Sequence, residues 1–222
     1  MIQIVAVHTA MALVDSTTKL FKEHLPMVKI NNIADDSLIQ EVIANNAVTP
    51  AVRRRLLSYY LAAAGSGATL IYNTCSSVGA VAEMGNLIAQ APVLRIDVPM
   101  AEKAVVSGKR IGVIATLPTT LAPTVDLLRR KAAEAGQIVE LVEGLAEGAF
   151  QAGQSGDPDK HDLLIRQAAE KMADQVDLFV LAQGSMARME AKLAEITGRP
   201  VLSSPLLGVL GVKQYLLGKG LI

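Results

Sequence analysis

The stretch ATLIYNTCSS, residues 68–77, runs from an apolar segment into a polar turn, and VDLFVLAQGS, residues 176–185, repeats this pattern. Each stretch contains a short run of aliphatic and aromatic residues, which is typical of a buried strand. The two stretches lie 108 positions apart, so Cys75 corresponds to Gln183 and Ser77 to Ser185. This correspondence indicates an internal repeat.

The same offset relates other apolar positions: Val5 to Val113, Leu13 to Leu121, Ile30 to Ile138, and Pro92-Val93-Leu94 to Pro200-Val201-Leu202. The predicted strands are Ile2–Val7, Met27–Ile30, Ala68–Tyr72, Val93–Ile96, Arg110–Ala115, Ile138–Val142, Leu178–Leu181 and Val201–Leu202. We therefore expect two duplicated halves, residues 1–105 and 106–205. A last helix, residues 206–222, is expected to pack back on the first half.

Segments with helical periodicity separate these strands. In residues 49–64, for example, Thr49 suits the N-cap, Pro50 the first turn and Gly65 the stop. Such alternation predicts parallel strands joined by right-handed crossovers. The expected fold class is α/β, with two pseudo-symmetric Rossmann-like halves that each have a mainly parallel four-stranded sheet flanked by helices. Because ligands bind beyond the carboxyl ends of parallel strands, we expect the active site in a cleft between the halves.

Composition narrows the function classes. Hydrophobic residues make up 51% of the chain and aromatic residues 3%, which fits helices packed on parallel sheets. Twenty-one basic and twenty-one acidic residues cancel, which argues against a nucleic-acid partner. No secretion signal and no membrane span is evident, and a lone cysteine fits a reducing compartment. We expect a cytoplasmic enzyme with no membrane partner.

Cys75 is the candidate catalytic residue. It follows a strand and precedes a helix that is expected to begin around Ser76-Ser77-Val78, so free backbone N–H groups should favour its thiolate. A thiolate in that place is a base or a nucleophile. The alternative is a small buried hydrophobic residue, but the neighbours of Cys75 are strongly polar for a core position.

Hydroxyl groups at strand ends can hold a carboxylate or an enolate. The alternative role for each of these Ser and Thr side chains is to cap a helix. His8 could orient the substrate or tune the thiol, and His161 either caps a surface helix or reaches the cleft. No pattern indicates a metal site or a phosphate-binding loop, so neither a metal nor a cofactor is expected. The candidate substrate-binding residues chosen on these grounds are His8, Thr9, Ser76, Ser77, Thr116, Thr119, Thr120 and Ser185.

The turn from Asn73 to Gly79, its counterpart from Leu181 to Ala187, and the duplicated halves resemble the aspartate/glutamate/hydantoin racemase superfamily over essentially the whole chain. Members of that superfamily need no cofactor and place one cysteine from each half on opposite faces of an acidic carbon. One thiolate removes a proton and the other thiol returns one. The resemblance implies a small carboxylate-containing substrate and a homodimer.

Carried over by position, the resemblance makes Cys75 the cysteine of the first half and places Asn73, Thr74 and Ser76 around the substrate carboxylate. It makes His8-Thr9 the functional end of the first strand. In the second half, Gln183 replaces the second cysteine at the catalytic position, and Gly184 beside it is a candidate substrate-binding residue. An amide neither accepts nor donates a proton at neutral pH, so a symmetric two-thiol racemisation is not expected.

Three hypotheses remain open at this point. The first is an isomerase or racemase that acts at the carbon next to a carboxylate or carbonyl, with Cys75 as base or nucleophile. The second is a lyase in which Gln183, Ser185 and Thr116 hold the substrate while Cys75 protonates an enediolate, since the similar arylmalonate decarboxylase works with a single cysteine. The third is a ligand-binding protein that has lost turnover.

Overall fold

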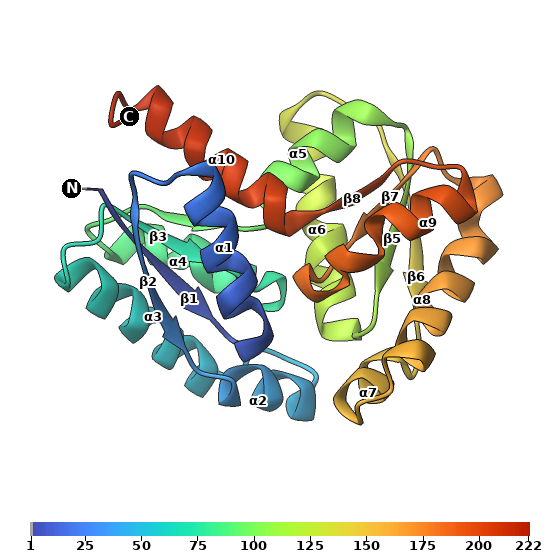
Figure 1. Ribbon diagram of the computed structural model, residues 1–222, viewed down its shortest axis with the longest axis horizontal. Helices are drawn as coiled ribbons and strands as arrows, with labels where there is room; N and C mark the ends of the chain where they lie inside the picture. Colours follow the sequence, from blue (N-terminus) through green and yellow to red (C-terminus); the bar gives the residue numbers. More distant parts are fainter. Residues whose placement is uncertain (1) are drawn as a thin grey trace. The chain divides into compact units, whose positions relative to one another are not determined.

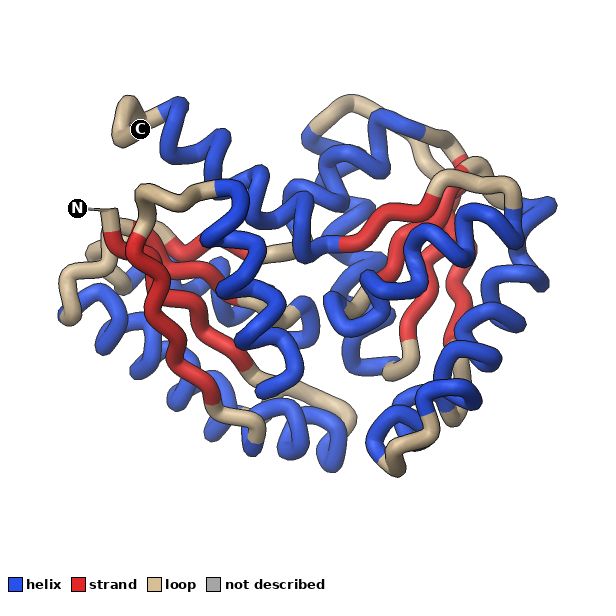
Figure 2. The backbone as a smooth tube through the Cα atoms, viewed as in Figure 1, coloured by secondary structure: helices blue, strands red, loops and turns tan. Residues whose placement is uncertain are grey.

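A computed structural model describes residues 2–222 and divides the chain into two compact units. One unit comprises the chain up to Pro99 together with Pro205–Ile222, and the other comprises Met100–Ser204. Helix α5 (Val98–Ser107) contains the first change of unit, and helix α10 (Ser204–Gly218) contains the second. Each unit has its own four-stranded sheet (Figure 2).

The first unit alternates strands and helices. Its parallel sheet has the order β2-β1-β3-β4. The elements are β1 (Gln3–His8), η1 (Met11–Leu13), α1 (Val14–His24), β2 (Lys29–Ala34), α2 (Ser37–Asn45), α3 (Pro50–Gly65), β3 (Leu70–Asn73), η2 (Ser76–Val78), α4 (Gly79–Ile88) and β4 (Val93–Arg95).

Strand β1 separates two apolar cores because its side chains point alternately to opposite faces of the sheet. Ile4 and Ala6 belong to the core that includes α1 and α10. Val5 and Val7 belong to the core that includes α2, α3 and α4. The first sheet is therefore covered by helices on both faces, as Figure 1 shows. The last helix contributes Val209, Val212 and Leu216 to the core of this unit.

Helix α3 begins and ends close to the predicted residues. The Thr49 side chain accepts a 3.1 Å hydrogen bond from the Val52 N–H, and Pro50 occupies the first helical position. The helix continues to Gly65. The predicted cap is therefore confirmed, and this helix carries Tyr60 into the core.

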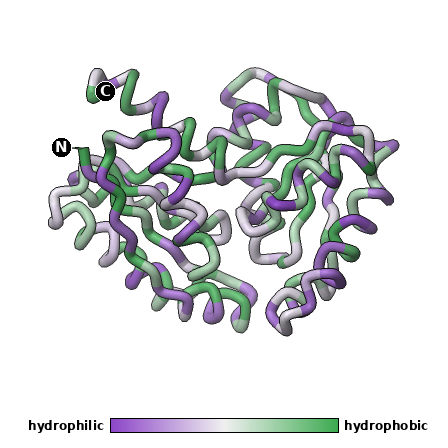
Figure 3. Tube along the Cα trace, viewed as in Figure 1, coloured by the Kyte–Doolittle hydropathy of each residue, from purple (hydrophilic) through white to green (hydrophobic). Residues whose placement is uncertain are grey.

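The second unit repeats the topology, with a parallel sheet in the order β6-β5-β7-β8. The predicted α/β class with two pseudo-symmetric halves is thus confirmed. In Figure 3, helix α8 carries both hydrophobic and hydrophilic residues. The elements that complete the second unit are β5 (Arg110–Ala115), α6 (Pro118–Glu134), β6 (Glu140–Leu145), α7 (Ala149–Gln154), α8 (Pro158–Met172), η3 (Ala173–Gln175), β7 (Leu178–Leu181), η4 (Gly184–Met189), α9 (Glu190–Thr197) and β8 (Val201–Ser203).

The predicted position of two strands was wrong. Strand β2 covers residues 29–34 rather than 27–30, and β6 covers residues 140–145 rather than 138–142. Ile138 lies before β6 and is 92% exposed. Ile30 lies beside Ile4, whereas Val142 lies beside Gly112, so Ile30 corresponds to Val142 and the repeat is offset by 112 positions here.

The cause of this error is a difference in length between the two units. Helix α6 has 17 residues, whereas α1 has 11 after a short η1 turn. The offset of 108 returns at Thr49 and Asp157, whose side chains cap α3 and α8.

Within residues 2–222, no helix has the length and apolar character needed to cross a membrane.

Candidate active site

The candidate site of the first unit lies beyond the carboxyl ends of β1 and β3. These strands are neighbours in the sheet, and Val7 pairs with Asn73. Thr9 follows β1, and Cys75 follows β3. The topology therefore brings two of the predicted site residues together although they are far apart in sequence.

Cys75 occupies the N-cap position of the short turn η2, in an extended conformation with φ −125° and ψ 116°. Its sulfur has hydrogen bonds from the Thr9 and Ser77 hydroxyl groups and from the backbone N–H groups of Ser77 and Val78. The residue is partly exposed, whereas Thr9, Ser76 and Ser77 are buried. Hydrogen-bond donors thus surround the sulfur of a residue that also packs against the apolar core beneath α2, α3 and α4.

The sequence predicted a thiol with a lowered pKa at Cys75, and the structure favours the opposite shift. Burial raises the pKa of the Cys75 thiol above its ordinary value, and the surrounding donors, Thr9 first, lower it by less. The backbone N–H groups act on the sulfur as expected, but the dense packing around it outweighs them even though some surface stays exposed. Cys75 is therefore a neutral thiol at neutral pH, with donors in place for the thiolate once it forms.

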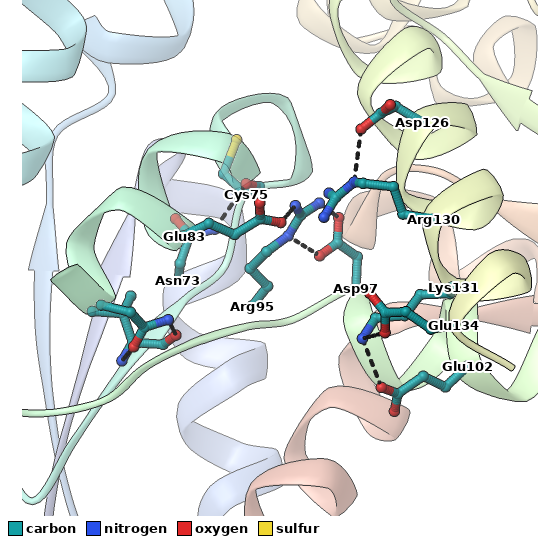
Figure 4. A network of polar contacts seen from close by, with 12 residues as sticks. Asn73, Cys75, Glu83, Arg95, Asp97, Glu102, Asp126, Arg130, Lys131 and Glu134 are labelled. Atoms are coloured by element: carbon teal, nitrogen blue, oxygen red, sulfur yellow. Dashed lines mark hydrogen bonds and ion pairs between the residues drawn. The ribbon is translucent and has the colours of Figure 1, made fainter.

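Asn73 fixes the turn that carries Cys75, as Figure 4 shows. Its side-chain Nδ2 donates to the Cys75 carbonyl oxygen at 2.9 Å. Its Oδ1 accepts a 3.1 Å hydrogen bond from the Tyr60 hydroxyl group. Asn73 is fully buried, and its bond to the Cys75 carbonyl oxygen holds the backbone of this turn. The carboxylate-binding role implied for Asn73 stays a prediction.

His8 and Thr74 form a second support. The His8 Nδ1 lies 3.0 Å from the Thr74 Oγ1, and the His8 Nε2 lies 2.9 Å from the Asn32 Oδ1. Asn32 donates to Thr18, which turns its amide oxygen toward His8. Burial lowers the pKa of His8, and the Asn32 hydrogen bond opposes this effect. We assign a neutral ring that donates from Nε2 to Asn32 and accepts from Thr74 at Nδ1.

Both ring nitrogens of His8 are therefore engaged within the first unit. The Thr74 backbone N–H donates to the Val7 carbonyl oxygen at 3.2 Å, so Thr74 is held by β1 while its hydroxyl proton is directed to His8. Residues 8 and 74 keep the ends of β1 and β3 in place around Cys75. Direct substrate contacts by these two side chains stay predictions.

In the second unit, Gln183 is the N-cap of η4, as Cys75 is of η2. The Gln183 Oε1 accepts a 2.7 Å hydrogen bond from the Thr116 N–H, and its Nε2 donates to the Thr116 Oγ1 at 2.6 Å. Thr116 corresponds to His8 in the repeat. Two residues expected to hold the substrate are thus bonded to each other, and the amide of Gln183 is held by the end of β5.

The other candidates of this unit differ in exposure. Thr119 and Thr120 lie in the first turn of α6, where Thr120 is buried and its backbone N–H bonds to the Leu117 carbonyl oxygen. The Thr119 Oγ1 is one of the buried side-chain oxygens for which residues 2–222 provide no hydrogen-bond partner. Gly184 begins η4 and is partly exposed, whereas Ser185 is exposed.

His161 binds neighbours in its own unit. Its Nδ1 lies 2.9 Å from the Asp162 Oδ1 and 3.2 Å from an Arg188 guanidinium nitrogen. Asp162 also forms an ion pair with Arg188, so the three side chains are in mutual contact. His161 therefore links the start of α8 to η4. Over residues 2–222, no group of three or more His, Cys, Asp or Glu side chains is arranged to hold a metal ion.

A buried ion network beside the Cys75 turn was not predicted from the sequence. Arg95 ends β4 and contacts both Asp97 and Glu83, as Figure 4 shows. Arg95 and Asp97 are buried. Two opposite charges in the apolar stretch Val93–Val98 were the available signal, because buried charges need partners.

Comparisons with known proteins agree with this fold. Allantoin racemase from Klebsiella pneumoniae has a TM-score of 0.71 and 16% identity, covering 99% of this chain and 89% of that chain. Glutamate racemase from Francisella tularensis has a TM-score of 0.77 and 14% identity, covering 100% and 83%. Aspartate racemase from Picrophilus torridus has a TM-score of 0.70 and 12% identity, covering 92% and 90%. A search of curated protein sequences finds no match.

At these identities the solved structures establish a shared fold. The family itself comes from a sequence model, described as Asp/Glu/Hydantoin racemase, which matches residues 2–210. That match extends from β1 into α10 and includes both strand-end turns. The chain therefore belongs to the Asp/Glu/Hydantoin racemase family.

Proposed function

We propose that this protein is a cofactor-independent isomerase that racemises or epimerises the carbon next to a carboxylate or carbonyl of an amino acid or derivative. Cys75 is the proposed base. The observation that carries the proposal is the set of donors on its sulfur: the hydroxyl groups of Thr9 and Ser77 and the N–H groups of Ser77 and Val78. These donors stabilise a thiolate in a site that otherwise disfavours charge.

In the proposed reaction, the Cys75 thiolate takes the proton from the acidic carbon. The electron pair of the broken C–H bond moves into the neighbouring carboxylate, which becomes an enediolate, or into a neighbouring carbonyl group, which becomes an enolate. The Cys75 thiol then returns a proton to the carbon. Ser76, buried next to Cys75, is a proposed ligand of the substrate carboxylate.

Gln183 supports a mechanism with one thiol. Its amide is bound through both polar atoms to Thr116, and an amide transfers no proton at neutral pH. The same sulfur therefore removes and returns the proton. Inversion requires the planar enediolate to present its other face, so return to the original face competes with inversion.

This competition gives a direct test. The protein is incubated in deuterated water with a panel of amino acids and hydantoins, while NMR follows exchange at the acidic carbon and polarimetry follows inversion. After the Cys75 thiol has exchanged its proton with the deuterated solvent, it delivers a deuteron to either face. We expect exchange to be faster than inversion, because some deuterons go to the original face. In Cys75→Ser, whose hydroxyl group is not ionised at neutral pH, exchange should be lost while the unfolding temperature is retained.

A second candidate is a lyase that decarboxylates a substituted malonate, with Cys75 as proton donor. The observation that favours it is the raised pKa of Cys75, because a neutral thiol is the form that donates a proton. Carbon dioxide release with a product of single handedness would support it, and a racemic product would contradict it. If neither reaction occurs and Cys75→Ala retains affinity for carboxylates, the protein is a binding member of the family.

A further inference from the structure

We infer that Arg95 is a positioning residue for Cys75, which acts through the turn that carries the sulfur. The inference rests on the proposed role of Cys75 and adds a residue from another strand to that site. Arg95 ends β4, and its register partner on β3 is Asn73. Its side chain is only 4% exposed.

The Arg95 guanidinium group links β4 to α4. Its Nε and Nη2 donate to the two carboxylate oxygens of Asp97 at 2.9 and 2.8 Å. Its Nη1 donates to the Glu83 Oε1 at 2.5 Å. Glu83 lies on α4, the helix that follows the η2 turn, and Figure 4 shows its carboxylate group beside Arg95. A planar group held by two carboxylates has little freedom to move.

This group lies directly against Gly79, the first residue of α4. A Cβ atom built on Gly79 would lie 2.6 Å from the Arg95 Nε and still closer to its Cζ. The Gly79 φ angle of −56° is an ordinary helical value that suits any residue. Glycine is therefore needed here for space, because the guanidinium group occupies the volume of a side chain.

The positive charge of Arg95 does not explain why its guanidinium group lies beside Gly79. The N-terminal end of a helix favours anions, so a cation beside the start of α4 is unfavourable without its carboxylate partners. A buried ion pair is also weak evidence for a gain in stability. The contact with Arg95 instead fixes the position of Gly79, which directly follows the η2 turn. It thereby positions the Ser77 and Val78 N–H groups that bond to the Cys75 sulfur.

The test is the pH profile of Cys75 alkylation by iodoacetamide, measured by mass spectrometry on the whole protein. In Gly79→Ala, the added methyl group displaces the turn from Arg95 and weakens the donors on the sulfur. We expect the profile to move to higher pH, with about tenfold less thiolate at neutral pH if the equivalent of one charge-assisted hydrogen bond is lost. A profile that is unchanged, or that moves to lower pH, overturns the inference.

Gly65→Ala is the matched control, since nothing lies within 4 Å of a Cβ built at that helical glycine of the same unit. Its profile should equal that of the parent protein. Circular dichroism establishes that each variant is folded. If Gly79→Ala does not fold, Glu83→Gln replaces it, because it weakens the link between Arg95 and α4 without adding volume.

The control for Glu83→Gln is Glu41→Gln. Glu41 is also paired with an arginine of the first unit, Arg55, at 2.8 Å, but lies on α2. We expect the alkylation profile to move in Glu83→Gln and to stay unchanged in Glu41→Gln. Because alkylation needs no substrate, this experiment can fail while Cys75-dependent exchange is observed, or succeed while no exchange is found.

Discussion

At the level of single residues, the protonation state of Cys75 separates the two candidate reactions. Because its pKa is raised, the neutral thiol predominates at neutral pH and the thiolate forms as the pH rises. If Cys75 is a base, kcat/KM rises with pH until the thiol has ionised. If Cys75 is a proton donor, kcat/KM falls over the same range. Initial rates across this range, with Cys75→Ser as the background, decide between the two roles.

The residue at position 183 should set how fast inversion is relative to exchange. In Gln183→Cys, a second thiol stands at the position that corresponds to Cys75, and the two hydrogen bonds to Thr116 are lost. For a racemase, we expect inversion to speed up relative to exchange, because a second sulfur can deliver a proton. The measurement is the ratio of deuterium incorporation to loss of optical rotation. Gln183→Ala is the control, because it also loses the Thr116 contacts but adds no thiol; an equal ratio in both variants would contradict the prediction.

The sequence predicted part of this site and missed another part for a physical reason. The polar turn around Cys75 is local, so the donors on its sulfur could be predicted from neighbouring residues, whereas the burial that raises the pKa of the thiol could not. The contact between Thr9 and Cys75 follows from the neighbouring positions of β1 and β3 in the sheet, an order that was not predicted from the sequence. The place of Arg95 depends on the packing of β4 under α4, and no local pattern reveals which carboxylates a buried arginine meets.

At the level of elements, helix α10 carries a close contact that can be tested. A Cβ atom built on Gly208 would lie 2.7 Å from the Ile96 carbonyl oxygen and nearer still to the Tyr72 hydroxyl group. We expect Gly208→Ala to destabilise the protein by about 1–3 kcal/mol, because backbone atoms cannot easily move aside. Urea unfolding measures this change.

Gly218 provides the control on the same helix, since nothing lies within 4 Å of a Cβ built there. We expect Gly218→Ala to be neutral or stabilising by up to about 1 kcal/mol, as for other helical glycines in open space. Equal losses in both variants would show that the close approach at Gly208 has no special cost.

The strands also show where sequence patterns are reliable. Strands β5 and β7 cover residues 110–115 and 178–181, as predicted. They lie inside the sheet and are almost entirely buried, so each appears as an apolar run. Strands β2 and β6 are edge strands with mixed exposure, so apolar residues before them were mistaken for strand. The pairing register, which no single segment contains, fixes their position.

At the level of the whole molecule, the chain builds two units with separate sheets and returns its last helix to the first. Leu216 of α10 is fully buried in the core that contains Ile4 and Leu70. Removing its side chain in Leu216→Ala leaves a cavity and should cost about 2–5 kcal/mol. Because this core belongs to the first unit, we expect amide hydrogen exchange to accelerate in β1 to β4 and α10, and to change little in β5 to β8.

Leu221→Ala is the matched control, because Leu221 is 45% exposed near the end of the same segment and should leave both sheets protected as in the parent protein. Equal acceleration in both sheets of Leu216→Ala would mean that the two units unfold as one cooperative structure. Acceleration confined to the first sheet would mean that residues 205–222 stabilise the unit that carries Cys75. Damage to the C-terminal segment would then reduce activity through the Cys75 turn, although none of its residues belongs to the candidate site.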